Sequence, residues 1–395
     1  MRLQLKVTSI MNSFPNTSNL VKRLTQTAAI LPIYQPTAVA DSPPAFGEVG
    51  VRYTQYSEDS LDKGKVIFGS EDRYDIDITQ VWIEAPLGGS WSVALDIQND
   101  YQTGASPWFV GANLDGEPAV IMSGASIQDN RIEVGVATRY YWADGNAGIN
   151  LTHSNEDDYE ALAWTADAAW NSNENSRTWS VSVSKSVDTI QPTKERIPVF
   201  IDRESLNTES IYFGVSQILN RTTIARLGLS YTYHDGFLSD PYKLRDKRPP
   251  SRNRTALMLG YRKFFIDPNG ALQIDYRFYS DSWGANSTTI TLGWSQDFTS
   301  QNINPYLRYY SQSGADFFYA IADLNAPFYA DDSRLSSFGA ITAGLSWRIE
   351  LGDWVAEAQI ERYLSDSDWA LSNGGDAPGL VDFWRGTIGL TWRFD

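Results

Sequence analysis

The chain has no cysteine among its 395 residues and only two histidines. The first absence excludes disulfides, thiolate metal sites and a cysteine nucleophile, and the second excludes a histidine-rich metal or catalytic centre. No apolar run reaches the roughly 18 residues that a membrane-spanning helix needs. Basic residues are in the minority, with 32 Lys and Arg against 48 Asp and Glu and a net charge of −16. Because nucleic-acid binding needs a basic footprint, we expect no nucleic-acid partner.

Aromatic residues, in contrast, are plentiful: they make up 13% of the chain, with 14 Trp and 21 Tyr. Transmembrane β-barrels place such residues in girdles at both membrane interfaces. The mean hydropathy of −0.34 is too polar for a bundle of membrane helices. A barrel tolerates it because only alternate strand residues face lipid. The composition therefore favours an all-β protein of the outer membrane of a Gram-negative bacterium.

The N-terminal segment has the order of features of an export signal. A Lys-Arg pair is followed by a short apolar stretch over 24–33 and then by Ala38-Val39-Ala40, which fits the small-x-small cleavage pattern. We therefore predict a signal peptide over 1–40, cleaved after Ala40, and a barrel domain over 41–395. The alternative is a disordered tail, and Met11 is a second candidate for the start.

Period-two alternation of apolar and polar residues dominates the chain from Phe46 onward. In 91–98, for example, large apolar residues occupy the odd positions and polar or small residues the even ones. Many such stretches exceed the ~9–11 residues that a tilted strand needs to cross a membrane, whereas the strands of a soluble sandwich are usually shorter. We predict a transmembrane, antiparallel, up-and-down β-barrel of about 16 strands, and the pattern is compatible with 14 to 18. The predicted strands cover 46–57, 71–85, 90–103, 130–142, 145–155, 158–172, 177–188, 208–219, 222–234, 253–266, 271–281, 285–298, 302–312, 337–350, 353–365 and 381–394.

The connections between these strands fall into two alternating sets. One set contains only short turns, such as Ala143-Asp144 and Leu351-Gly352, and the other is mostly long. Outer-membrane barrels have short periplasmic turns and long extracellular loops, so both termini should be periplasmic. The long connections are 58–70, 104–129, 189–207, 235–252, 313–336 and 366–380.

The last predicted strand ends in a recognisable pattern. Thr387, Gly389, Trp392 and Phe394 follow one another as a polar residue, a glycine and two aromatics at alternate positions. This resembles the assembly signal of outer-membrane barrels, which implies the barrel assembly machinery as a partner. One residue, Asp395, follows the final aromatic and departs from the pattern.

Charged residues occur on the polar face of many predicted strands. A charge that faces lipid near the midplane costs about 2–4 kcal/mol, so these side chains should point into the lumen. Arginines concentrate between about 226 and 308, and acids near 75–100 and 357, so two walls of opposite charge could create a field across a water-filled channel. The alternative is that ion pairs fill a closed lumen. The candidates are Arg131, Arg139, Arg226, Arg254, Arg262, Asp275, Arg277, Arg308, Glu357 and Glu361, with Arg252, Arg348, Arg385, Arg393, Asp75, Asp77, Asp96, Asp100, Glu133 and Asp297 on the same faces.

The long connection after 235 is the most basic stretch of this acidic chain, with Lys243, Arg245, Lys247, Arg248 and Arg252. It could contact lipopolysaccharide phosphates, fold into the pore or bind an anionic ligand. Contact with lipopolysaccharide is the interpretation that we favour. Lipid and lipopolysaccharide of the outer membrane are therefore expected partners.

Three further groups are weaker candidates for chemistry. His234-Asp235 could form a rim hydrolase site, but no second acidic pair is identifiable and an ordinary rim position is favoured. His153 should face the outer interface. The acidic stretches at 156–158 and 331–332 lack the ligand spacing of a Ca²⁺ loop and are predicted to be solvated. We expect no catalytic residues, metal or cofactor.

Several stretches resemble the bacterial family known as domain of unknown function 3570. They are Gly104–Pro107, Ser123–Ser126 with Asp129 and Arg131, Asp235–Lys243 followed by Arg248–Arg252, Asp275–Tyr279 with Asp281 and Trp283-Gly284, and Pro305–Phe318. The resemblance covers about 100 to 320. It implies an outer-membrane barrel. The family is also associated with neighbours that include a flavin-transferring lipoprotein, which suggests an envelope redox context. The family provides no catalytic residues to carry over.

Together these features predict an outer-membrane channel for small polar or charged solutes, because a barrel of about 16 strands is too wide for side chains to fill. The connections 104–129 and 313–336 are candidate constrictions. One alternative is a non-conducting scaffold for an envelope assembly, in the redox context that the resemblance suggests, and another is a rim enzyme using His234 and Asp235.

Overall fold

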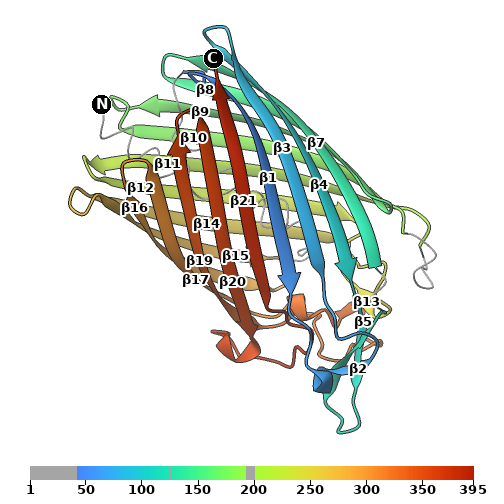
Figure 1. Cartoon of the computed structure of the whole chain (residues 1–395). Helices are drawn as coiled ribbons and strands as arrows, with labels where there is room; N and C mark the ends of the chain where they lie inside the picture. The colour runs from blue at the N-terminus through green and yellow to red at the C-terminus, as the bar shows by residue number, and fades with distance from the viewer. Residues whose placement is uncertain (1–41, 125–126, 193–200) are drawn as a thin grey trace.

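The structure is a computed structural model that describes residues 42–124, 127–192 and 201–395. The predicted signal peptide lies outside these residues. Sixteen antiparallel strands form one closed barrel (Figure 1), as the alternation predicted. The ring closes where the first strand pairs with the last, from Gly47 opposite Phe394 to Glu58 opposite Phe383. In order around the ring, the strands are β1 (Gly47–Glu58), β3 (Asp75–Leu87), β4 (Trp91–Gly104), β7 (Ile127–Trp142), β8 (Gly145–Asn155), β9 (Tyr159–Ser172), β10 (Arg177–Ile190), β11 (Glu204–Asn220), β12 (Thr223–Gly236), β14 (Ser251–Phe265), β15 (Gly270–Asp281), β16 (Asn286–Asp297), β17 (Gln301–Gln312), β19 (Phe338–Leu351), β20 (Trp354–Asp366) and β21 (Phe383–Phe394).

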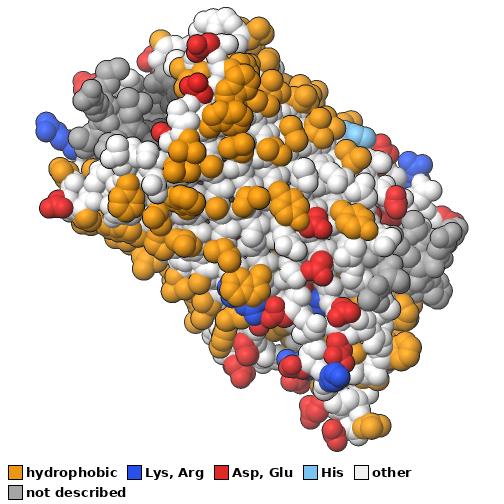
Figure 2. Space-filling view, viewed as in Figure 1, with side chains coloured by type: hydrophobic (Ala, Val, Ile, Leu, Met, Phe, Trp, Pro, Cys, Tyr) orange, Lys and Arg blue, Asp and Glu red, His pale blue; other side chains and the backbone are white. Residues whose placement is uncertain are grey.

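The two faces of the barrel wall differ as the alternation requires. On β4, Trp91 and Leu95 point outward and are 45% and 38% exposed, whereas Ser92 points inward and is 3% exposed. The outward residues form a broad apolar band over the visible face of the barrel (Figure 2). Such a band would be unfavourable in water and is what a lipid bilayer covers. No helix in the described residues is long and apolar enough to span a membrane.

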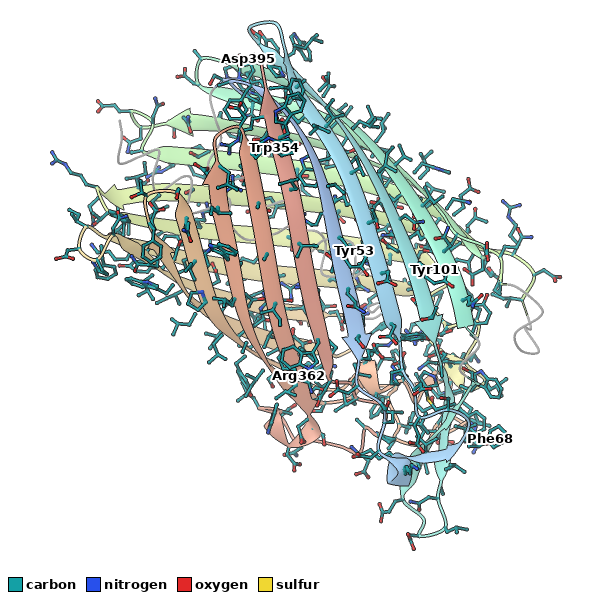
Figure 3. All side chains as sticks on the ribbon, viewed as in Figure 1. Tyr53, Phe68, Tyr101, Trp354, Arg362 and Asp395 are labelled. Atoms are coloured by element: carbon teal, nitrogen blue, oxygen red, sulfur yellow. The ribbon has the colours of Figure 1, made fainter. Side chains whose placement is uncertain are left out.

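Outward aromatic side chains gather towards both ends of this band. Trp354 lies near one end of the barrel, and Tyr53 and Tyr101 lie farther towards the other (Figure 3). Each is 40–45% exposed. The arrangement matches the interfacial girdles that the aromatic content indicated.

The two ends of the barrel are built differently. At one end, which we call the turn end, hairpins close in tight turns, such as Gly352-Asp353, where Gly352 has a φ of 68° that favours glycine. The C-terminus lies at this end (Figure 1). At the other end, the loop end, most connections are long, in the alternation that the sequence predicted.

The long connections contain secondary structure that the sequence did not predict. β2 (Val66–Phe68), β5 (Pro107–Ala112) and β6 (Pro118–Met122) form a small sheet, and β13 (Asp246–Lys247) pairs with β18 (Tyr329–Ala330). Short 3-10 turns add η1 (Lys63–Lys65), η2 (Ser333–Leu335) and η3 (Ser367–Trp369). We call the connections 59–74, 105–124, 237–250, 313–337 and 367–382 together the cap.

Candidate functional site

Three cap connections meet although they start on separate parts of the ring. The backbone N–H of Val110, between β4 and β7, donates to Oδ2 of Asp331, between β17 and β19, at 2.9 Å. Nη1 of Arg245, between β12 and β14, donates to the Val110 carbonyl oxygen at 3.1 Å. Because these three hairpins are well separated around the barrel, their connections can meet only by reaching inward across the mouth. The cap therefore covers the lumen at the loop end.

The cap has an apolar core of its own. It consists of buried cap residues such as Leu335, packed together with Trp283 of the short connection between β15 and β16, and both of these residues are 2% exposed. The rings of Trp283 and Phe317 pack edge to face with centroids 5.1 Å apart. Burial of this kind is a property of a folded unit, and it separates the cap from freely solvated surface loops.

A buried ion cluster lies beside that core. Asp332 is 2% exposed, and its Oδ2 lies 2.5 Å from Arg334, 3.0 Å from Arg248 and 3.3 Å from Lys243. Arg248 also contacts Asp246 at 2.6 Å. Burial opposes ionisation of Asp332, but the three cations, Arg334 foremost, hold the pKa of this carboxyl well below its ordinary value. Asp332 is thus a buried anion that joins two cap connections.

The neighbouring carboxyl behaves in the opposite way. Asp331 is 3% exposed, and its burial raises its pKa to about 6, although the Val110 N–H and Lys243 act against this shift. Asp331 and Asp332 had been predicted to lie in a solvated acidic loop, and that prediction is wrong. The sequence gives no local sign of it, because the partners lie far away along the chain.

The basic loop is also buried more than expected. The side chains of Lys243 and Arg248 are 6% and 0% exposed, and Arg245 stacks over Phe109 with its guanidinium carbon 4.4 Å from the ring centroid. Lys247, in contrast, is exposed. The favoured interpretation, contact with lipopolysaccharide, is therefore wrong for Lys243 and Arg248, since they neutralise acids inside the cap.

Most predicted lumen residues do face inward, and many are ion-paired. Arg131 lies between Asp100 and Glu133 at 2.6 and 2.9 Å. Further inward pairs include Arg139 with Asp167 at 2.8 Å, Arg262 with Asp275 at 2.8 Å, Arg348 with Glu357 at 2.5 Å, Arg393 with Glu48 at 3.1 Å, and Arg385 with Glu361.

Two inward arginines differ from these. In the described part of the chain, neither Arg277 on β15 nor Arg308 on β17 forms an ion pair. Their guanidinium carbons lie 5.2 and 5.7 Å from the ring centroids of Tyr279 and Tyr306. Stacking on an aromatic face orients a guanidinium and leaves its edge available for hydrogen bonds.

Charge is distributed unevenly around the lumen. On β12, β14, β15 and β17, inward arginines outnumber inward carboxylates, whereas carboxylates predominate on β1, β3, β4 and β7 on the other side of the ring. The arginines are Arg226, Arg252, Arg254, Arg262, Arg277 and Arg308, and the carboxylates include Glu48, Glu58, Glu84, Asp96, Asp100 and Glu133. The lumen therefore has both local ion pairs and a separation of charge across its width.

Two predicted lumen acids lie on the outer face instead. Asp75 and Asp77 are exposed, and the buried inward positions between and after them are Ile76 and Ile78, at 4% and 7%. Tyr53 donates a hydrogen bond to Asp77 on the outside. The prediction that Asp75 and Asp77 face the lumen is therefore wrong. Apolar residues can face inward where the cap covers the lumen, and carboxylates beyond the apolar band can face water.

His234 and Asp235 do not form a catalytic dyad. His234 points inward and is 6% exposed, with Nδ1 3.0 Å from the Thr208 hydroxyl, while Asp235 lies on the exposed outer face. Asp235 therefore cannot orient His234 as the rim-enzyme hypothesis requires. His153 lies on the exposed face and contacts Glu160 at 3.1 Å, in agreement with its predicted position.

One group of carboxylates could hold a metal ion. Among the described residues, oxygens of Asp129, Glu156 and Asp158 lie within 4.8 Å of one another at the loop end. Tyr242 of the cap donates a hydrogen bond to Asp158. Exposed acidic groups of this kind are common without an ion, so the geometry alone does not define a cation site.

The C-terminal pattern occupies the closing strand. Thr387 faces inward, 2.9 Å from the hydroxyl of Thr54 on β1. Trp392 faces outward, with its ring centroid 6.2 Å from that of Trp354 and 5.5 Å from that of Phe394. Gly389, opposite Arg52 in the pairing of β1 and β21, leaves room beside that side chain. The pattern thus contributes to both faces of the strand that completes the ring.

Comparison with known proteins places the chain. The family model described as "Protein of unknown function (DUF3570)" matches residues 22–382. The chain belongs to this family. The DUF3570 chain matches none of the curated proteins.

Solved outer-membrane barrels are similar to this DUF3570 protein. A bacterial polysaccharide outer membrane secretin aligns with a TM-score of 0.50 and 9% identity, over 89% of this chain and 99% of that one. CdiB from Acinetobacter baumannii has a TM-score of 0.49 and 8% identity, over 88% and 60%. OccD3 from Pseudomonas aeruginosa has a TM-score of 0.45 and 7% identity, over 89% and 91%. At 9% identity the similarity to the secretin concerns the fold alone, which is that of an outer-membrane barrel.

Proposed function

We propose that this DUF3570 protein is an integral outer-membrane channel for small polar or charged solutes, with its loop end outside and its termini in the periplasm. The observation that carries the proposal is a polar inner wall that solvent reaches. Inward carboxylates such as Asp275 and Glu357 keep 36% and 32% of their side-chain surface exposed although they lie within the closed ring. Barrels of this strand number are too wide for side chains to fill.

The shape of the lumen supports passage along one side. On β9 and β10 the inward side chains are small, among them Ala161, Ala163, Ser182 and Ser184. The arginine-rich strands β14, β15 and β17 carry long inward side chains, and their tyrosines lie beside them. Space is therefore expected next to the small-residue strands, and solutes there would face a charged wall.

The cap then controls access from outside. It includes both connections that were predicted to be constrictions, 104–129 and 313–336, in so far as they are described. Because its central contacts are ionic and hydrogen-bonded, it can separate without rupture of the barrel. We infer that the described conformation is a closed or narrow state.

The same cap favours a second candidate function, a non-conducting scaffold. Its buried core is that of a stable plug, and such a plug would make the barrel a platform for an envelope partner. A scaffold needs no opening of the cap, and this difference separates the two candidates.

The test is single-channel recording in planar bilayers, on the wild type and on a variant whose residues 107–122 are replaced by a short Gly-Ser linker. A channel predicts small or infrequent steps for the wild type and larger, steady steps for the variant. Silence from both proteins, each shown to be folded by heat-modifiable migration, would reject the channel and leave the scaffold.

A further inference from the structure

A cluster of cations lies just below the cap, on the inner wall of β12, β14 and β15. It comprises Arg252, Arg254 and Arg277 with His234, which we call the cation cluster. Arg252 stands opposite His234 in the pairing of β12 and β14, and Arg254 is the next inward residue on β14. Arg252, Arg254 and His234 are 1%, 4% and 6% exposed. Arg277, lower on β15, is half-buried and opens towards the lumen.

The cluster contains more positive charge than its acid can neutralise. Among the described residues, Asp281 is the carboxylate within it, and its Oδ2 accepts from Nε of Arg252 at 2.8 Å and from the Tyr279 hydroxyl at 2.7 Å. Its Oδ1 accepts the backbone N–H groups of Trp283 and Ala285 at 2.9 and 3.0 Å. Both oxygens of Asp281 are thus occupied, while Arg254 and Arg277 add two further cations.

Several N–H groups of the cluster are buried without an acceptor. Within the residues that the structure describes, Nη1 of Arg252 and Nε of Arg277 have no hydrogen-bond partner, and neither has Nε2 of His234. When the Thr208 hydroxyl donates to Nδ1 of His234, the ring carries its proton on Nε2 and becomes a donor. A buried donor without an acceptor is unfavourable, and a buried excess of like charge is more so. An anion with several oxygens would relieve both.

The cluster is also joined to the cap. The guanidinium carbon of Arg252 lies 4.1 Å from the ring centroid of Trp283, and Trp283 packs in the apolar core of the cap against Phe317. Nε1 of Trp283 donates to the Ser251 carbonyl oxygen at 3.0 Å. An anion held by the cluster would therefore lie directly beneath the cap, reachable from the lumen past Arg277.

We propose that the cation cluster of Arg252, Arg254, Arg277 and His234 is a binding site for a small oxyanion, a free phosphate, sulfate or carboxylate solute. Guanidinium groups bind such anions through charge-assisted and bidentate hydrogen bonds. Because the cluster lies inside the ring, lipid headgroups of the surrounding membrane do not reach it. The proposal deepens the proposed channel function by naming a solute class, but the binding itself does not depend on conduction.

The experiment measures binding to the full-length folded barrel in detergent. Inorganic phosphate, sulfate and succinate are titrated by calorimetry at constant ionic strength, with chloride as the reference. Saturable binding of at least one oxyanion is expected, with at least tenfold weaker affinity in Arg254→Gln and in Arg277→Gln. Two variants are used because either one could impair folding. Arg348→Gln, which removes an inward arginine at the turn end, is the matched control and should bind as the wild type does.

The proposal would be overturned if none of the three oxyanions bound saturably. It would also be overturned if Arg348→Gln lost as much affinity as the cluster variants, because binding would then depend only on the net charge of the lumen. The result is separable from the proposed function. A barrel that conducts without binding leaves the channel intact and rejects the site, whereas one that binds without conducting supports the site within a scaffold.

Discussion

Asp332 is the residue on which the cap depends most, because it is a buried carboxylate in contact with three cations. Asp332→Asn would leave Lys243 and Arg334 without their main counter-charge, and loss of one partner from a buried network costs about 3–5 kcal/mol. We expect the cap to open while the barrel stays folded. Hydrogen exchange should then rise in 237–250 and 313–337 but not in the strands. Asp323→Asn, at an exposed position in the same connection, is the control, and unchanged protection in Asp332→Asn would contradict the central role of this residue.

Asp331 makes the cap sensitive to pH. Its pKa in the folded protein is about 6, raised by burial above the ordinary value of 3.8. A raised pKa stabilises the folded cap at low pH, and that contribution is lost as pH rises through about 6. Burial raises the pKa of nearby Asp246 as well, so it acts in the same direction. Asp332 has the opposite sign, but its contribution is lost only below its ordinary value. Lys243 faces all three carboxyls and lowers the pKa of each.

The closed cap should accordingly be more stable at pH 5 than at pH 7.5, by an amount on the order of 1 kcal/mol from Asp331. Since the chain has no native cysteine, spin labels at Leu114→Cys and Leu324→Cys, both exposed, report the distance across the cap. The distance distribution should broaden from pH 5 to pH 7.5, and Asp331→Asn should reduce this change. A distribution that is identical at both values would rule out the mechanism.

At the scale of the element, glycines fix the alignment of strands by admitting an aromatic ring from the next strand. Gly344 on β19 stands opposite Tyr306 on β17, and a Cβ added to Gly344 would lie 2.4 Å from the tyrosine ring. Gly344→Ala must displace a ring that is 7% exposed, at a cost of about 1–3 kcal/mol. The temperature at which the folded band is lost in semi-native electrophoresis should fall. Gly386→Ala, with no atom of the described residues within 4 Å of the added Cβ, should leave it unchanged, and equal behaviour of the two variants would contradict the packing argument.

The strands could be predicted because the alternation within each strand reflects the environment on its two faces. In 91–98 the period of two follows from lipid on one side and polar lumen on the other, and no distant contact is needed to read it. The cap connections have no such local record. The contact between Val110 and Asp331 joins positions 221 residues apart. The local sequence around Lys243 and Arg248 would look the same whether they contacted lipopolysaccharide or a buried carboxylate. Only the three-dimensional contacts distinguish these possibilities.

For the whole molecule, the inward position of the charges followed from the cost of placing them in lipid, but their pairing did not. Arg131 and Arg277 look alike in sequence, yet Arg131 is held by two carboxylates and Arg277 stacks on Tyr279. The register of neighbouring strands decides which arginines are neutralised by a carboxylate and which can attract an anionic solute. The closed ring sets that register, and a single-strand pattern does not contain it.

The arginines without a carboxylate partner should set the ion preference of the lumen. Arg277 and Arg308 lie on the arginine-rich side, across from Asp96 and Glu133, so anions passing the lumen meet a positive wall that ion pairs do not cancel. In a barrel with residues 107–122 replaced, we expect a preference for chloride over potassium. Arg277→Gln combined with Arg308→Gln should lower it by about threefold, because the local potential that concentrates anions is lost. The reversal potential in a salt gradient measures this ratio.

Arg348→Gln combined with Glu357→Gln removes an ion pair of zero net charge and should leave the ratio unchanged, whereas a cation preference that persists in all three proteins would show that the acidic wall controls the lumen.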